Sequence, residues 1–172
     1  MTRGAVLSFE HRILVIADTH GFLPDWLCER QFDTLLHAGD IGDERTLTRL
    51  YCYENIHAVR GNTDCTLGAL PDTLKTDIEG VRFFLVHNLT APHRIMPQNA
   101  DILAGWRPRV VIFGHTHQPF LREQEGIIYL NPGALGNVPA EQRSYAVITI
   151  REGAVCCVEI YTASHEKILS WP

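Results

Sequence analysis

Five short apolar runs, each followed by residues able to bind a metal ion, constrain this chain more than any other feature of its sequence. The runs and the residues after them are 13–17 with Asp18 and His20, 35–38 with Asp40, 56–59 with Asn62, 81–86 with His87, and 110–113 with His115 and His117. Such runs are typical of strands buried on both faces. Because ligands of open α/β sheets bind beyond the carboxyl ends of strands, we expect these seven side chains to share one sheet edge.

The size and composition of the chain are those of one globular domain. Its 172 residues are 45% hydrophobic and 20% charged, so we expect a single domain over residues 1–172 with a substantial core. No apolar stretch approaches the roughly 20 residues of a membrane helix, and residues 1–10 lack a signal-peptide pattern. These features predict a cytoplasmic protein that does not associate with membranes.

The charge and the cysteines narrow the classes of partner and compartment. A formal net charge of −5 argues against a generic nucleic-acid-binding surface, although metal ions can reverse the local field and attract a small anionic substrate. The five cysteines are odd in number and lack C-x-x-C spacing, so we expect reduced thiols, mostly buried, in a reducing compartment. The oligomeric state stays open, a homo-oligomer included.

Strand and helix signals alternate in the first third of the chain. Strands are expected at 13–17, 35–38 and 56–59, with helices at 24–30 and 43–53 between them. This order gives a parallel βαβαβ unit with right-handed crossovers. The remaining signals predict strands at 74–78, 81–86, 110–113, 120–124, 127–130, 144–150 and 155–161, with a helix at 98–106. We therefore expect one α/β domain whose second half is largely antiparallel.

The seven expected ligands form a mixed oxygen and nitrogen donor set. Two carboxylates, four imidazoles and one amide suit Mn²⁺, Fe²⁺, Co²⁺, Ni²⁺ or Zn²⁺ better than Ca²⁺ or Mg²⁺. The absence of a thiolate from this set argues against a structural zinc knuckle. Seven ligands exceed the needs of one tetrahedral ion and fit two ions that share a carboxylate. With Asp18, Asp40 and a bound hydroxide, two divalent ions leave a charge of about +1, which attracts a phosphodiester.

Taken in order, these motifs resemble those of a known family. Asp18-Thr-His20, Gly39-Asp40, Gly61-Asn62-Thr-Asp64, His87 and Gly114-His115-Thr-His117 are similar to the successive motifs of the calcineurin-like metallophosphoesterases. The chain length, the compact spacing and Asn131-Pro132-Gly133 resemble the small prokaryotic phosphodiesterase branch. The resemblance covers residues 13 to 133 and implies a β-sandwich flanked by helices, a four-layer αββα fold with its metal site at the carboxyl ends of the strands.

The resemblance also implies a role for each ligand. Asp18, His20 and His117 would hold one metal ion, Asn62, His87 and His115 would hold the other, and Asp40 would bridge them. A metal-bridging hydroxide would attack phosphorus in line, with Asn62 also contacting a phosphate oxygen. Asp40, Asn62 and His87 are thus the expected catalytic residues of a metal-dependent phosphodiesterase. The expected cofactors are two divalent ions, Mn²⁺ first, with Fe, Ni, Co or Zn as alternatives.

Two positions depart from the family pattern. Thr63 stands where larger members carry a histidine suited to protonating the leaving group, and where the small branch commonly has cysteine. The loss of a general acid costs about 10²–10⁴-fold on poor leaving groups, so we expect a preference for activated ones. Asn88 stands where glycine is usual, and it either narrows the pocket or contacts substrate. His93 and Arg94, in a proline-rich stretch, are further expected rim contacts to a small, nucleotide-like phosphodiester.

Other functions of the same fold remain open at this stage. The fold also serves as a non-catalytic scaffold in a retromer subunit, whose relatives lose histidines from the motifs that this chain keeps. A phosphomonoesterase or protein phosphatase is a further alternative, which the missing histidine after Asn62 and the small size disfavour. Nearby, Asp64 is expected to order its loop, and His37 to pack within a buried strand, where it could support Asp40.

Overall fold

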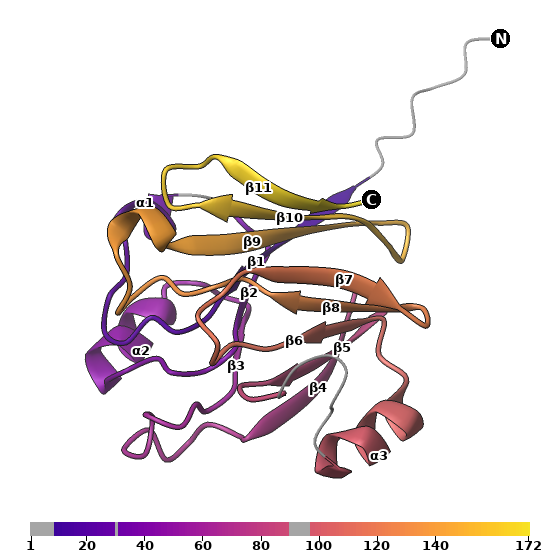
Figure 1. Ribbon diagram of the computed structural model, residues 1–172, viewed down its shortest axis with the longest axis horizontal. Coiled ribbons are helices and arrows are strands. Elements are labelled where there is room, and N and C mark those ends of the chain that lie inside the picture. The colour runs from indigo at the N-terminus through magenta and orange to yellow at the C-terminus, as the bar shows by residue number, and fades with distance from the viewer. Residues whose placement is uncertain (1–8, 30, 90–96) are drawn as a thin grey trace, which may run out of the picture.

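Two β-sheets packed face to face make up most of the computed structural model, which describes residues 9–29, 31–89 and 97–172 (Figure 1). The first sheet has the order β11-β10-β9-β1-β2-β3. Its strands are β1 (Glu10–Ile16), β2 (Thr34–His37), β3 (Ile56–Ala58), β9 (Ser144–Arg151), β10 (Ala154–Thr162) and β11 (Lys167–Trp171). The second sheet, of order β4-β5-β6-β8-β7, contains β4 (Thr73–Ile78), β5 (Val81–Val86), β6 (Val110–Ile112), β7 (Phe120–Gln124) and β8 (Ile127–Asn131).

Helices cover the outer faces of both sheets (Figure 1). On the first sheet, α1 (Trp26–Glu29) and α2 (Glu44–Leu50) contribute Leu27 and Leu50 to a buried apolar cluster. On the second, α3 (Pro97–Trp106) contributes Leu103 to another cluster. A short 3₁₀ turn (Ala140–Gln142) precedes β9. The expected four-layer αββα sandwich is therefore confirmed.

The apolar runs are continuous because each central strand has apolar contacts on both of its faces. In β1, Ile13 and Val15 point into the core between the sheets, whereas Leu14 and Ile16 point to the helices outside. The same alternation recurs in β5, where residues 83 and 85 face inward and residues 84 and 86 face α3. Successive side chains of a strand point to opposite faces, so only a run without polar interruptions satisfies both layers.

Each sheet contains three adjacent parallel strands. Strands β1, β2 and β3 are parallel, with β9 antiparallel to β1. In the second sheet β5, β6 and β8 are parallel, and only the edge strands β4 and β7 run against them. The expectation of a largely antiparallel second half is confirmed, since five of the seven pairings that involve the described strands after β3 are antiparallel. The pairings of β5 with β6 and of β6 with β8 are the parallel ones, because α3 returns the chain to start β6 alongside β5. His87 Nδ1 lies 2.8 Å from the Ala38 carbonyl oxygen, so the parallel strands of both sheets end at the same edge.

Several element boundaries and exposures differ from expectation. The helix expected at 43–53 ends at Leu50, and it begins where Asp43 caps it by accepting a 2.7 Å hydrogen bond from the Thr46 amide. Strand β11 was not expected because four of its five residues are exposed, which leaves no alternating apolar pattern. The expectation of mostly buried thiols is wrong for Cys52, Cys65, Cys156 and Cys157. The first two are exposed and the last two are half-buried. No helix among the described residues is long and apolar enough to span a membrane.

Candidate metal centre

The loops after β1 and β2 hold two carboxylates close together. The Asp18 amide donates to the Gly39 carbonyl at 3.0 Å, and the His20 amide donates to the Asp40 carbonyl at 2.9 Å. These bonds extend the parallel pairing of β1 and β2 beyond the strands themselves. Asp18 and Asp40 are both buried as a result, which is unusual for ionisable side chains without a charged partner.

Backbone strain is concentrated at this site. Five of the seven expected ligands have φ angles between 45° and 70°, namely Asp18, His20, Asp40, His115 and His117. Residues with a Cβ atom rarely adopt this left-handed region, and each such residue costs of the order of 1–3 kcal/mol unless the surrounding structure fixes it. Strain of this kind gathers at functional sites, where it directs side chains towards one point.

Two glycines allow the loops to approach the carboxylates closely. A Cβ atom on Gly114 would lie 2.7 Å from Asp18 Oδ2, and one on Gly61 would collide with Asp40 Oδ1. Both glycines directly precede expected ligands, His115 and Asn62. The Gly-His and Gly-Asn pairs are therefore needed because only glycine lets the next residue reach the same carboxylates.

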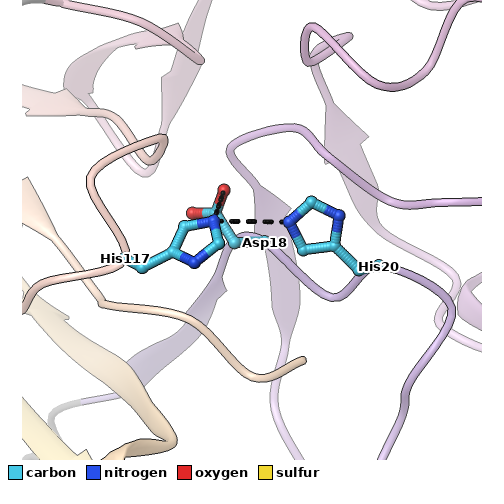
Figure 2. Close-up of side chains that lie close together, drawn as sticks. All are labelled: Asp18, His20 and His117. Carbon is cyan, nitrogen blue, oxygen red and sulfur yellow. Dashed lines mark hydrogen bonds and ion pairs between the residues drawn. The ribbon is translucent and has the colours of Figure 1, made fainter. Parts of the chain in front are cut away.

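The first group of ligands joins the loop after β1 to the loop after β6 (Figure 2). His117 Nε2 lies 3.3 Å from Asp18 Oδ1 and 3.3 Å from His20 Nε2. The ligand atoms of these three residues all lie within 4.8 Å of one another. One carboxylate and two imidazoles converging on one point form a donor set that fits a divalent metal ion.

The second group lies beside the first and combines Asp18, Asp40 and His87. His87 Nε2 is 3.4 Å from Asp40 Oδ2, and His20 Nε2 is 3.7 Å from the same oxygen. Asp40 thus contacts a histidine of each group, while Asp18 belongs to both. The exposed end of the second group is formed by Asn62, whose Oδ1 lies 3.0 Å from His87 Nε2 and 3.0 Å from His115 Nδ1. All seven expected ligands are therefore brought together.

The contacts of His87 require either a proton or a metal ion beside the Asp40 carboxylate. Its Nδ1 faces the Ala38 carbonyl oxygen, which can only accept a hydrogen bond, so Nδ1 carries the hydrogen. In the neutral ring, Nε2 is then an acceptor that points at the Asp40 carboxylate, a second acceptor. Either a proton or a metal ion must lie between them, and a ligating histidine commonly donates its other ring nitrogen to a backbone carbonyl in this way.

Burial and charge shift the pKa values of both carboxyls. Removal from water raises the pKa of Asp18 to about 7, a change that the nearby His87 only partly offsets. Burial alone would raise the pKa of Asp40. A hydrogen bond from the His87 ring, when that ring is protonated, and one from the Thr63 amide (2.9 Å) outweigh the burial and hold the pKa of Asp40 below its usual range. Burial, with the neighbouring His20, lowers the pKa of His117. Neutral imidazoles beside an ionised carboxylate are the forms that bind metal ions.

Residues around the ligands fix the loops that carry them. Asp64 accepts hydrogen bonds from the Gly42 amide at 3.0 Å and the Gly61 amide at 2.8 Å, as expected of a loop-ordering carboxylate. His37 accepts from the Gly39 amide at 3.1 Å and contacts the Thr19 hydroxyl at 3.0 Å. Burial lowers the pKa of His37 to about 3, so it stays neutral and links the two carboxylate-bearing loops.

Asn131, from the Asn-Pro-Gly motif, orders the loop of the histidine pair. Its Nδ2 donates to the Gly114 carbonyl at 2.9 Å and to the Thr116 hydroxyl at 3.1 Å, while its Oδ1 accepts from the Gly133 amide. The motif therefore shapes the turn beside the site through the asparagine side chain as much as through its proline and glycine.

A cleft of about 490 Å³ opens beside the second group, with Asn62, His87 and His115 on its wall. Asn88, one of the three expected substrate contacts, also lines it. The other two, His93 and Arg94, lie outside the described residues. Sequence reasoning missed the remaining polar lining, Arg60, Asp72, Thr73 and Asn99. No motif marks these positions, which become neighbours only when the two sheets pack together.

Metal binding is expected to release a proton from Asp18. Since the pKa of Asp18 is about 7 in the metal-free protein, the carboxyl is largely protonated at pH 6, and a metal ion must displace that proton. Titrating Mn²⁺ at pH 6.5 in two buffers of different ionisation enthalpy should reveal release of about one proton or more per protein. At pH 9 Asp18 is already ionised, so the release should be smaller there by the proton that Asp18 contributes. Identical heats in both buffers at pH 6.5 would contradict the raised pKa.

Comparison with known proteins gives the class that this fold and site define. Residues 12–153 match the calcineurin-like phosphoesterase superfamily domain. A protein named probable metallophosphoesterase from Methanothermobacter thermautotrophicus is 35% identical over 130 residues, covering 70% of this chain and 74% of that protein. A protein named phosphodiesterase from Methanocaldococcus jannaschii is 24% identical over 172 residues, covering 81% of this chain and 99% of that protein.

Solved structures share the fold over nearly the whole chain. A Streptococcus pneumoniae protein described as a predicted phosphoesterase has a TM-score of 0.72 and 24% identity, covering 95% of this chain and 97% of that chain. Vps29 from Entamoeba histolytica, in complex with Zn²⁺, has a TM-score of 0.71 and 21% identity, covering 91% and 98%. The chain belongs to the calcineurin-like phosphoesterase superfamily, which confirms the resemblance seen in its ordered motifs.

Proposed function

We propose that this protein is a metal-dependent phosphodiesterase with a two-metal centre. The observation that supports this most is the pair of adjoining ligand groups that share Asp18, with Asp40 in contact with a histidine of each. Asp18, His20 and His117 would hold one ion, Asn62, His87 and His115 the other, and Asp40 would lie between them. The mixed oxygen and nitrogen donors favour Mn²⁺, with Fe, Ni, Co or Zn as alternatives.

The residues divide the chemical work between holding the ions and placing the phosphate. Two divalent ions, when bound, would lower the pKa of a water molecule and neutralise charge on the phosphate oxygens. Asp40 and His87, both buried, hold their positions through the Thr63 amide and the Ala38 carbonyl. Asn62 is exposed at the cleft, so its amide can contact a phosphate oxygen directly.

Three features favour a diester over a monoester. The cleft beside Asn62 gives room for an organic group on the phosphate. The residue after Asn62 is Thr63, whose side chain cannot act as the imidazole acid of larger members. The small positive charge of the loaded site suits the single negative charge of a diester. A relative in Methanocaldococcus jannaschii carries the name phosphodiesterase, which supports the same choice.

The function is tested by hydrolysis of aryl phosphodiesters in the presence of Mn²⁺. We expect metal-dependent hydrolysis of bis(p-nitrophenyl) phosphate that exceeds hydrolysis of p-nitrophenyl phosphate. Because no imidazole follows Asn62, the hydrolysis rate of methyl aryl phosphates should fall steeply as the pKa of the leaving phenol rises. For the poorest leaving groups, the missing general acid should cost about 10²–10⁴-fold in rate. A flat series would show that another group protonates the leaving oxygen.

The two alternatives to this function have distinct outcomes in the same assay. A phosphomonoesterase would hydrolyse p-nitrophenyl phosphate faster than the diester. A scaffold protein would bind Mn²⁺ and hydrolyse neither ester with any divalent ion. The similarity to Vps29 shows only that the fold is shared, and all seven expected ligands are present here.

A further inference from the structure

A second cavity lies at the end of the sandwich opposite the metal centre. It has a volume of about 410 Å³, and the first residues of β5 and of β10 form part of its wall. The metal ligands follow the other ends of the parallel strands, as His87 follows β5. A strand of six residues is about 20 Å long, so a small molecule in this cavity would not touch the metal centre.

Three glycine turns open the cavity. Gly80, Gly126 and Gly153 are each the second residue of a two-residue hairpin turn, and all three line the cavity. Their φ angles of 75° to 79° favour glycine. A Cβ atom on Gly126 would contact nothing beyond its own chain neighbours within 4 Å, and one on Gly80 would contact only the Gly153 Cα, at 3.7 Å. The turns therefore leave open space beside the remaining lining residues.

Three arginines, Arg82, Arg107 and Arg109, line the same cavity. The Arg109 amide donates to the Arg82 carbonyl at 2.8 Å, which holds these two residues side by side. The Arg109 side chain is already engaged, since its Nη1 lies 2.6 Å from Glu123 Oε1 and donates to the Gly126 carbonyl at 2.5 Å. Arg109 therefore fixes the wall of the cavity, and its charge is largely balanced by Glu123.

The charges of Arg82 and Arg107 are not balanced in this way. Both side chains are exposed, and neither forms an ion pair with any residue that the structure describes. Asp77 lies opposite Arg82 on β4, but its Oδ1 accepts a hydrogen bond from the Gly80 amide at 2.9 Å. No carboxylate is among the described lining residues. The cavity therefore presents two guanidinium groups that lack an anionic partner.

The backbone of Arg107 has an unusual conformation beside the cavity. Its φ angle is 50°, and its amide donates to the Leu103 carbonyl at 2.9 Å, just after the end of α3. Glycine is the usual residue at such a position, because a Cβ atom is unfavourable in the left-handed region. The next residue, Pro108, restricts this backbone further. Strain of this kind gathers at functional sites, so it points to a role for the arginine side chain.

The remaining lining and the surrounding charge narrow the class of ligand. Val81, Pro108, Ala154 and Val155 offer apolar contacts beside the arginines. An exposed glutamate precedes each of the three lining glycines, and the chain has a net charge of −5. Both features disfavour a long polyanion such as a nucleic acid. Guanidinium groups bind phosphate through paired N–H donors, and a cavity of this volume holds a small molecule.

We propose that this cavity is a second binding site, which takes a small organic phosphate, with Arg82 and Arg107 as its anion-binding residues. The phosphate group would lie between the two guanidinium groups, and the organic part would lie against the apolar lining. The inference goes beyond the proposed phosphodiesterase function and does not rest on it, because none of the metal ligands lines this cavity.

Phenylphosphonate is the probe for this site, because it joins a phosphate-like dianion to an apolar ring and has no ester bond to be hydrolysed. It is titrated into the full chain at pH 8 with EDTA, and amide shifts are followed by ¹⁵N NMR. We expect saturable shifts at the amides of Gly80, Gly126 and Gly153, and none with benzyl alcohol, which lacks the anionic group. The same shifts should persist when Zn²⁺ replaces EDTA.

Arg107→Gly separates the loss of binding from a loss of folding. Glycine suits a φ angle of 50°, so urea unfolding should show a variant at least as stable as the wild type. The Kd for phenylphosphonate should rise about three- to tenfold, the effect of one charge-assisted contact at an exposed site. Arg82→Gln should raise it similarly. Arg122→Gln is the matched control and should leave the Kd unchanged, because Arg122 is exposed on β7 and does not line the cavity.

The outcomes decide between this site and its alternatives. The proposal is wrong if phenylphosphonate shifts none of the three glycine amides, if it shifts them only with Zn²⁺ present, or if the three arginine variants bind it equally well. It is also wrong if a single-stranded oligonucleotide shifts these amides and phenylphosphonate does not. If the shifts are found but no phosphodiester is hydrolysed with any divalent ion, the second site stands and only the proposed function fails.

Discussion

Replacing Asp40 with asparagine is expected to lower kcat/KM for bis(p-nitrophenyl) phosphate by at least about 10³-fold, equivalent to about 4 kcal/mol of transition-state stabilisation. Asp40 contacts His20 of one ligand group and His87 of the other, so its carboxylate would be the shared ligand of the two proposed ions. An amide has the same shape but no charge, and it cannot donate two anionic oxygens to neighbouring cations. Steady-state rates over a range of Mn²⁺ concentrations measure the effect.

Asp33→Asn is the matched control for this substitution. Asp33 directly precedes β2, at the end opposite Asp40, and accepts a 2.7 Å hydrogen bond from the Arg12 amide that an asparagine oxygen can also accept. The control should therefore keep its activity. If Asp40→Asn remained as active as Asp33→Asn in a folded protein, the assignment of the centre to these loops would be refuted.

Replacing Asp18 with asparagine is expected to stabilise the metal-free protein and to abolish its response to metal. The pKa of Asp18 is raised to about 7 by burial, so the wild-type protein must bury a charge above that pH. The folded state binds this proton more tightly than the unfolded state, and its stabilising effect is lost as the pH rises from about 4 to about 7. At pH 8 the variant should gain about 2–4 kcal/mol in free energy of unfolding.

Urea unfolding at several pH values, with and without Mn²⁺, measures both parts of this prediction. The gain without metal should shrink as the pH falls towards about 4, where Asp18 is protonated in both states. With Mn²⁺ the order should reverse, because ligand binding to the folded wild type adds stability that the variant cannot gain. A variant less stable than wild type at pH 8 without metal would mean that the hydrogen bond from the His115 amide to Asp18 outweighs the burial of charge.

The fold and the convergence of the seven expected ligands were predictable because each follows from a strong local rule. An unbroken apolar run requires a strand with neighbours on both faces, as residues 13–16 of β1 have. The chain direction then fixes which end of each parallel strand carries the polar residues. By this rule His115 and His117 follow β6, the third strand of the second sheet. The positive φ angles of these two histidines could not be predicted from the sequence.

The cleft could not be predicted, because its residues follow no local pattern. Arg60 comes from the loop after β3, Thr73 begins β4, and Asn99 lies in the first turns of α3. A single asparagine in a helix is indistinguishable by sequence from a surface residue. Strand β11 was missed for a related reason, since an exposed edge strand carries no alternation of apolar and polar residues.

The division of the ligands between the two sheets has a consequence for how the molecule is held together. Asp18, His20, Asp40 and Asn62 follow strands of one sheet, while His87, His115 and His117 follow strands of the other. Ions bound among these residues would cross-link the two sheets at one end of the sandwich, and would join segments that are nearly one hundred residues apart in the chain. Neither half of the chain carries a complete set for either ion. Metal binding would therefore require that the two sheets are packed correctly, and removal of the ions by a chelator would weaken the contact between the sheets.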